Sequence, residues 1–155
     1  MAGTIDARLK ELGVTLPQAA APAANYVPAV RSGAMLYISG QLPMANGEIK
    51  VKGKLGGGVS LEDGAEAARL CALNIVAQAK AALDGDLDRV VRVVKLVGFV
   101  NSAPDFTDQP KVVNGASNMM ADIFGDKGKH ARSAVGVGAL PFDVSVEVEA
   151  ILEVS

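Results

Sequence analysis

Cysteine and histidine are almost absent from this chain, and their scarcity excludes two kinds of site. One cysteine, Cys71, and one histidine, His130, cannot supply the usual His/Cys ligand set of a zinc site within one chain. We therefore expect no metal, and no cofactor is expected either. A single cysteine also forms no internal disulfide, which suits a reducing cytoplasm. Cys71 falls in an Ala- and Leu-rich stretch, which indicates a buried thiol rather than a reactive one.

The chain also lacks a long apolar run and an excess of positive charge. No stretch approaches the roughly 18–20 apolar residues of a membrane span, and no basic start precedes an apolar segment as in a signal peptide. A soluble, cytoplasmic protein is expected. The net charge of −2 predicts no nonspecific binding to nucleic acid or anionic membrane. The length of 155 residues suits a single domain, residues 1–155, with a real core.

The first third of the chain predicts a short helix followed by strands. Thr4 can cap a helix that ends near residue 12, and residues 1–25 are expected to form this helix and an extended lead-in rich in Ala and Pro. Residues 27–30 and 34–39 are typical of two short strands. The pair Asn46-Gly47 is a strong signal for a tight turn.

Two helices and a central strand are predicted in the middle of the chain. Ser60 with Asp63 resembles a capping box that opens a helix to about residue 84. Residues 87–100 are nearly continuous Val, Leu and Phe, as in a strand covered on both faces. A second helix is expected from about Pro110 to Gly125. The order of elements predicts an α+β fold, in which two helices pack on one face of a mixed β-sheet.

The last stretch, residues 131–154, alternates with period two, which is typical of strands with unlike faces. Its halves, 131–140 and 144–154, are expected to pair as a closing hairpin. One face would carry the core. The other face would hold an arginine, small residues and carboxylates: Arg132, Ala134, Gly136, Gly138, Glu147 and Glu149.

That second face has two interpretations. It is either the solvated outer face of an antiparallel sheet or a binding site. Small side chains along a strand admit another backbone, a subunit or a ligand, and Arg132 can hold a carboxylate or phosphate through two parallel hydrogen bonds. No segment remains to cover the face, so a symmetric oligomer closed through it is expected. A simple hairpin would leave Arg132 and Glu147 on the order of 13 Å apart, so a ligand, water or neighbouring subunit would lie between them.

Two motifs in the chain resemble the signatures of the YjgF/RidA family, often labelled endoribonuclease L-PSP and known as enamine/imine deaminases. The first is Ser39-Gly40-Gln41-Leu42-Pro43, and the second is Ala131-Arg132-Ser133 … Leu140-Pro141 … Val146-Glu147-Val148-Glu149-Ala150. The similarity covers most of residues 26–154 and is greatest to the longer, chorismate mutase-like branch. It implies a chorismate mutase-like fold and a homotrimer with pockets between subunits.

The resemblance also implies roles for individual residues. Arg132 would hold the carboxylate of a 2-imino acid, and Glu147 would position the water that hydrolyses the imine to a 2-keto acid and ammonia. These two are the expected catalytic residues. The implied substrate-binding positions are Tyr26, Ser39, Gly40, Asn114 and Ala134. For Tyr26, a structural role in anchoring its loop stays open as an alternative.

Two rival functions remain open from the sequence. The first is a noncatalytic or regulatory trimer that only binds a small carboxylate. The second is an endoribonuclease, which would need an acid and a base around a 2′-hydroxyl and cations for phosphates. One histidine and an acidic total charge disfavour that chemistry, and His130 is expected to be a loop or strand-edge residue.

Overall fold

A five-stranded mixed sheet forms the centre of the computed structural model, which describes residues 3–21 and 24–155. Its strands lie in the order β1-β2-β7-β5-β6, and only β5 and β6 run parallel. Their bounds are Ala29–Ser32 (β1), Met35–Gln41 (β2), Val90–Asn101 (β5), Ala131–Val137 (β6) and Val146–Val154 (β7). A separate two-stranded ribbon joins β3 (Met44–Ala45) to β4 (Glu48–Ile49). The predicted mixed sheet is therefore confirmed.

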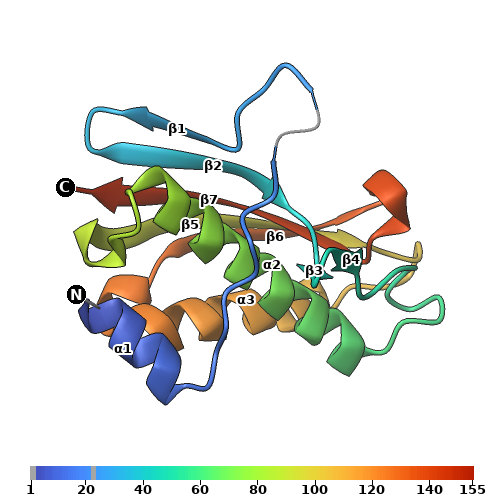
Figure 1. Cartoon of the computed structure of the whole chain (residues 1–155). Helices are drawn as coiled ribbons and strands as arrows, with labels where there is room; N and C mark the ends of the chain where they lie inside the picture. The colour runs from blue at the N-terminus through green and yellow to red at the C-terminus, as the bar shows by residue number, and fades with distance from the viewer. Residues whose placement is uncertain (1–2, 22–23) are drawn as a thin grey trace.

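The three α-helices of the described residues lie on the same side of the sheet (Figure 1). They are α1 (Thr4–Glu11), α2 (Leu61–Ala82) and α3 (Gln109–Phe124). Three short 3-10 turns complete the elements: Leu87–Arg89, Gly125–Gly128 and Pro141–Asp143. The apolar core lies between the sheet and helices α2 and α3. This confirms the α+β prediction with two helices on one sheet face, and α1 is added at their edge.

The predicted closing hairpin is wrong, because β5 lies between β6 and β7. Strand β5, helix α3 and strand β6 form a crossover unit, and two strands joined through a helix pair in parallel. The connection from β6 to β7 therefore passes over the end of β5. There the buried Asn101 amide donates to the Val144 carbonyl at 3.1 Å and to Asp143 Oδ1 at 3.2 Å.

The predicted face of the small residues is also wrong. Arg132, Ala134 and Gly136 are level with Leu96, Gly98 and Val100 of β5, whose residues face the helices. A Cβ added at Gly136 would stand 2.6 Å from Nε2 of Gln109 on α3. Ala134 and Gly136 thus lie on the side of the sheet that carries α3, and Gly136 makes room for the Gln109 side chain. The same applies to Gly98, where an added Cβ would stand 2.6 Å from Cγ2 of Val113.

Several local predictions are confirmed. The Ser60 hydroxyl accepts the Asp63 N–H at 3.0 Å and caps α2. Asn46 and Gly47 both have positive φ in the turn between β3 and β4, as a tight hairpin requires. Cys71 is fully buried, and burial raises the pKa of its thiol well above the ordinary value, so the thiol stays protonated and inert.

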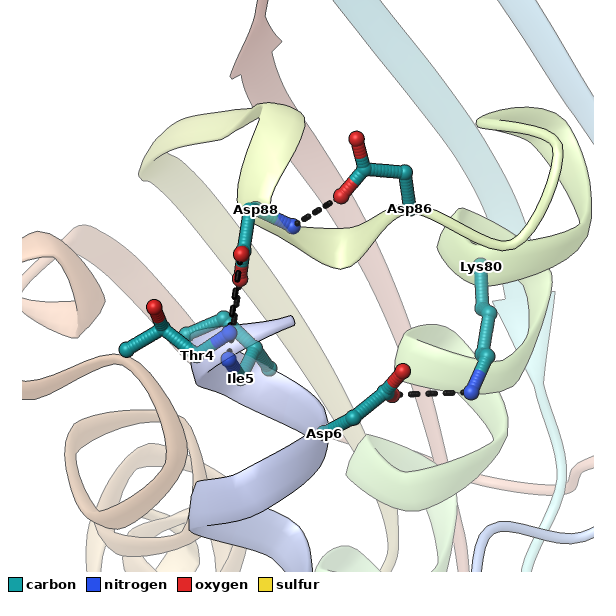
Figure 2. Close-up of polar contacts among 6 residues, drawn as sticks. All are labelled: Thr4, Ile5, Asp6, Lys80, Asp86 and Asp88. Carbon is teal, nitrogen blue, oxygen red and sulfur yellow. Dashed lines mark hydrogen bonds and ion pairs between the residues drawn. The ribbon is translucent and has the colours of Figure 1, made fainter. Parts of the chain in front are cut away.

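The start of α1 departs from the prediction, because Thr4 does not cap it. The N-cap residue is Gly3, and the cap is supplied from a distant segment by Asp88 (Figure 2). The Asp88 carboxylate accepts the N–H groups of Thr4 at 2.8 Å and Ile5 at 2.9 Å. An ion pair of 2.8 Å between Asp6 and Lys80 adds a second attachment to α2. Helix α1 is therefore attached to the rest of the protein through Asp88 and through Lys80.

Helix α2 is buried on nearly all sides over residues 70–79. The sheet covers one side and α3 another, and the chain leaving α1 crosses the outside of α2 (Figure 1). The Gln78 side chain fastens this crossing by donating to the Ala20 carbonyl at 2.9 Å. Of the helices in the described residues, none is long and apolar enough to cross a membrane.

Candidate functional site

Arg132 lies on the edge strand β6, and its side chain reaches over α3. Its Nη1 donates to Asn114 Oδ1 at 2.8 Å and to the Ser117 hydroxyl at 3.2 Å, while Nη2 points to the Pro110 carbonyl at 3.4 Å. The structure thus brings together two of the predicted site residues, Arg132 and Asn114. Ala134 follows two residues along the same face of β6, partly buried against the core.

Ser39 and Gly40 lie at an irregularity of β2. Between Ile38 and Gln41, three steps along β2 match two along β7, which is the pattern of a β-bulge. The Ser39 backbone N–H and hydroxyl both donate to the Pro28 carbonyl, at 3.0 Å and 3.2 Å. Bulges often re-aim groups beside functional sites. Here the bulge turns Gly40 toward β7.

Glu147 of β7 lies directly against Gly40. A Cβ added at Gly40 would stand 2.9 Å from Cδ of Glu147 and closer still to Oε1, so only glycine leaves the carboxylate in this place. Burial, and secondly the charge of Glu149, raise the pKa of the Glu147 carboxyl. A carboxyl group with a raised pKa is better matched to proton transfer near neutral pH. Ser39, Gly40 and Glu147 therefore form a second cluster.

The two clusters lie on opposite faces of the sheet. Arg132 is level with Leu96 on the helix side, and Glu147 is level with Phe99 on the other side. The Cα atoms of Arg132 and Glu147 are about 14 Å apart. The two positions are offset by three residues along the strands, at about 3.3 Å each, and by two strand spacings across the sheet, at about 4.8 Å each. One chain cannot therefore bring both side chains to the same small ligand.

The sheet face that carries Glu147 has no covering helix among the described elements, and it is largely apolar. Val30, Tyr37 and Val135 are 51%, 47% and 43% exposed on strands β1, β2 and β6. Half-buried Val97, Phe99 and Ile151 continue the apolar surface between them. A hollow of about 340 Å³ lies on this face, with Ser39, Lys95 and Glu149 in its lining. A contiguous apolar surface of this kind is typical of an interaction site.

Tyr26 precedes β1 and is 52% exposed. It does not line the hollow on the sheet, so this chain alone does not join it to either cluster. Ser117 was not predicted as a site residue, yet it contacts Arg132. The signal was present, because Asn114 and Ser117 are three residues apart on a helix and share one face. Among the described residues, no group of acidic, His or Cys side chains is arranged to hold a metal.

Comparison with known proteins gives consistent results. The family model described as "YjgF/chorismate mutase-like, putative endoribonuclease" matches residues 6–153. Protein TCP17 of Trypanosoma cruzi is 53% identical over 154 residues, covering 99% of this chain and 96% of that protein. The crystal structure of Atu1372, a protein of unknown function from Agrobacterium tumefaciens, is 55% identical with a TM-score of 0.92, covering 97% of this chain and 92% of the other. The crystal structure of E. coli TdcF with bound serine is 26% identical with a TM-score of 0.64, covering 89% and 94%.

Proposed function

Because the chain belongs to the YjgF/RidA family, we propose that it forms a homotrimer that hydrolyses reactive 2-imino or enamine acids. Each ligand site would lie between two copies of the chain. One copy would supply Arg132 with Asn114 and Ala134, and its neighbour would supply Glu147 with Ser39 and Gly40. Tyr26, exposed before β1, would close the site from one of these copies.

The observation that carries this proposal is the separation of two ordered clusters on opposite faces of one sheet. Each cluster is ordered by contacts within its own chain, since Asn114 accepts a hydrogen bond from Arg132 at 2.8 Å and Gly40 makes room for Glu147. Neither has a complementary cluster within reach in the same chain, because about 14 Å separates them. A second copy supplies what each one lacks.

The apolar sheet face supports the trimer on grounds different from those first expected. The small residues of β6 do not share a face with Glu147, because they lie on the side of the sheet that carries α3. The exposed face with Tyr37 and Val135 provides an alternative surface for a neighbouring copy. Contact between copies through this face would bury Glu147 further and bring another chain to the Ser39–Gly40 bulge.

Arg132 would bind the carboxylate of the substrate. Asn114 and Ser117 accept both Nη1 hydrogens, and Pro110 lies near one hydrogen of Nη2. Among the described residues, no acceptor is found for Nε–H. This hydrogen and the second Nη2–H form a fork on the free edge of the guanidinium, which matches two carboxylate oxygens.

Glu147 would assist the addition of water to the imine carbon. The carboxylate accepts a proton from water as the oxygen bonds to carbon, and the C=N double bond becomes a C–N single bond. Glu147 returns the proton to nitrogen, which gives a carbinolamine. Transfer of the proton of the carbinolamine hydroxyl to its nitrogen then breaks the C–N bond as the C=O bond forms, and releases ammonia and the 2-keto acid. Imines hydrolyse readily, so positioning and modest proton transfer suffice for this reaction. Because the substrate is short-lived, the protein would act in the cytoplasm, close to the enzymes that release the imine.

The test couples a PLP-dependent dehydratase or an amino-acid oxidase to detection of the keto acid. The buffer is chosen so that spontaneous hydrolysis is slow enough to measure. The protein should accelerate product formation, and Arg132→Ala should abolish the acceleration. Glu147→Gln should lower kcat more than it raises KM, because its contribution would be greatest in the transition state. A rate equal to that of the protein-free control across several imines would refute the deaminase proposal.

A noncatalytic trimer that binds a small carboxylate is the second candidate. It is favoured by the structure of the relative TdcF with bound serine, an amino acid that carries a carboxylate. Binding of 2-oxobutyrate without any effect on imine hydrolysis would select it. The endoribonuclease in the family description receives less support, since the net charge is −2 and both nitrogens of the single histidine contact protein atoms.

A further inference from the structure

Behind Arg132 lies a short chain of polar groups that ends at His130. The His130 ring places Nε2 at 2.9 Å from the Ser117 hydroxyl and Nδ1 at 2.6 Å from the Gly128 carbonyl. The same hydroxyl accepts Nη1 of Arg132 at 3.2 Å. Both Ser117 and His130 are half-buried. Three segments, α3, the turn before β6, and β6 itself, meet at this hydroxyl.

The direction of these hydrogen bonds follows from what each group can donate. A carbonyl only accepts, so Nδ1 of His130 carries a hydrogen and donates it to Gly128. In the neutral ring Nε2 then accepts, so the Ser117 hydroxyl donates its hydrogen to Nε2. The lone pairs of Ser117 remain for Arg132. With the ring neutral, the donors run in one direction, from Arg132 through Ser117 and His130 to Gly128.

This order fixes which edge of the guanidinium is free. With Asn114 and Ser117 on the two Nη1 hydrogens, the guanidinium cannot rotate about its Nε–Cζ bond without losing both partners. The fork of Nε–H and Nη2–H then stays turned toward the ligand. Without an acceptor at Nε2 of His130, the Ser117 hydroxyl loses the hydrogen bond that fixes its rotamer. Its oxygen can then leave the place in which it accepts from Nη1.

We propose that Ser117 and His130 are positioning residues that hold the Arg132 fork ready for a carboxylate. They act through Arg132 and do not touch the ligand themselves. The binding of a carboxylate by Arg132 rests on the function proposed above. The orientation of the Arg132 guanidinium is independent of that function, and it can be measured without a ligand.

The test uses two substitutions of His130 that separate its two contacts. In His130→Gln, the amide reaches the place of Nε2 and offers Ser117 an oxygen acceptor. In His130→Asn, the shorter amide reaches the place of Nδ1 and retains only the bond to Gly128. Ser117→Ala removes the hydroxyl, and Asn118→Ala is the matched control, since Asn118 is the exposed neighbour on α3. Melting temperatures confirm that all four variants fold.

The first measurement is the Kd for 2-oxobutyrate by calorimetry. Ser117→Ala and His130→Asn should weaken binding by about 3- to 10-fold, which is the range for loss of one ordinary intramolecular hydrogen bond. His130→Gln and Asn118→Ala should stay within about twofold of wild type. Wild-type affinity in Ser117→Ala, or equal weakening in the Gln and Asn variants of His130, would overturn the proposal.

The second measurement needs no ligand and separates this proposal from the proposed function. In NMR spectra of labelled protein, Arg132 is assigned by its loss in Arg132→Lys. Hindered rotation should give separate Nη1 and Nη2 signals in wild type and His130→Gln, and averaged signals in Ser117→Ala and His130→Asn. If the four proteins show this pattern of separate and averaged signals but wild type binds no carboxylate, the proposed function fails and the positioning role stands. Averaged signals in wild type would overturn the positioning role itself.

Discussion

Replacement of Gly40 by alanine should reduce catalysis and leave stability almost unchanged. The new Cβ would stand 2.9 Å from Cδ of Glu147 and closer to Oε1, whereas ordinary contact begins at 3.4 Å. The carboxyl carbon must therefore retreat by about 0.5 Å and its oxygen by more. Displacement of a catalytic group on the order of 1 Å can cost about 100-fold in rate. We expect kcat for imine hydrolysis to fall by about 10- to 100-fold.

The stability of Gly40→Ala should change by less than about 1 kcal/mol, because its φ is not in the left-handed region and the group that must move is a flexible side chain. Gly115→Ala is the matched control. There the added Cβ would stand 2.8 Å from the backbone carbonyl carbon of Ala65, where α2 and α3 pack closely. Since a backbone cannot retreat alone, this variant should lose about 1–3 kcal/mol of unfolding free energy.

Coupled imine hydrolysis and urea unfolding distinguish the two glycines. The expected pattern is a catalytic defect without destabilisation for Gly40→Ala, and destabilisation for Gly115→Ala. Wild-type kcat and KM in Gly40→Ala would refute the role assigned to the Glu147 carboxylate. A loss of stability as large as that of Gly115→Ala would instead make Gly40 a packing residue.

Three further predictions concern stability, each measured by urea unfolding. Ser60→Ala removes the cap of α2 and should cost about 1 kcal/mol. The N–H groups of Ile5 and Thr4 lower the pKa of Asp88, so its contribution to stability is present above the unfolded-state pKa of about 3.9 and is lost as pH falls through the lower folded value. Asp88→Asn should therefore remove that part of the acid dependence, and an unchanged pH slope would contradict the cap. The pKa of Glu147 is raised by burial and then by Glu149, so wild type should lose stability as pH rises from the unfolded value through the folded one. Glu147→Gln should abolish that loss, and a slope identical to wild type would contradict it.

The helices and the fold class could be predicted because their signals are local. Ser60 with Asp63 marks the start of α2, and the side-chain cap is found there. The pairing of strands was wrong because period two identifies a strand and not its neighbour. The better signal was the strand–helix–strand order of β5, α3 and β6, which favours a parallel pair.

The sequence predicts a set of candidate site residues, but it does not predict their arrangement. Small residues on β6 indicated a close approach, and the approaching element is α3 instead of another subunit. Because the small-residue face of β6 is on the helix side of the sheet, Arg132 and Glu147 lie on opposite sides. Ser117 was missed although its spacing of three residues from Asn114 puts both on one face of α3, and only the fold brings His130 and Arg132 to its hydroxyl.

The central claim, that one ligand site combines Arg132 of one copy with Glu147 of another, is tested most directly by mixing two inactive variants. Arg132→Ala and Glu147→Ala are unfolded together, refolded as a mixture and assayed for imine hydrolysis. Random assembly places an intact Arg132 beside an intact Glu147 in about a quarter of the sites of a closed ring, so about a quarter of wild-type activity should return. Each variant refolded alone should stay inactive. A mixture that stays as inactive as its components would show that both residues act from the same chain, which contradicts the account.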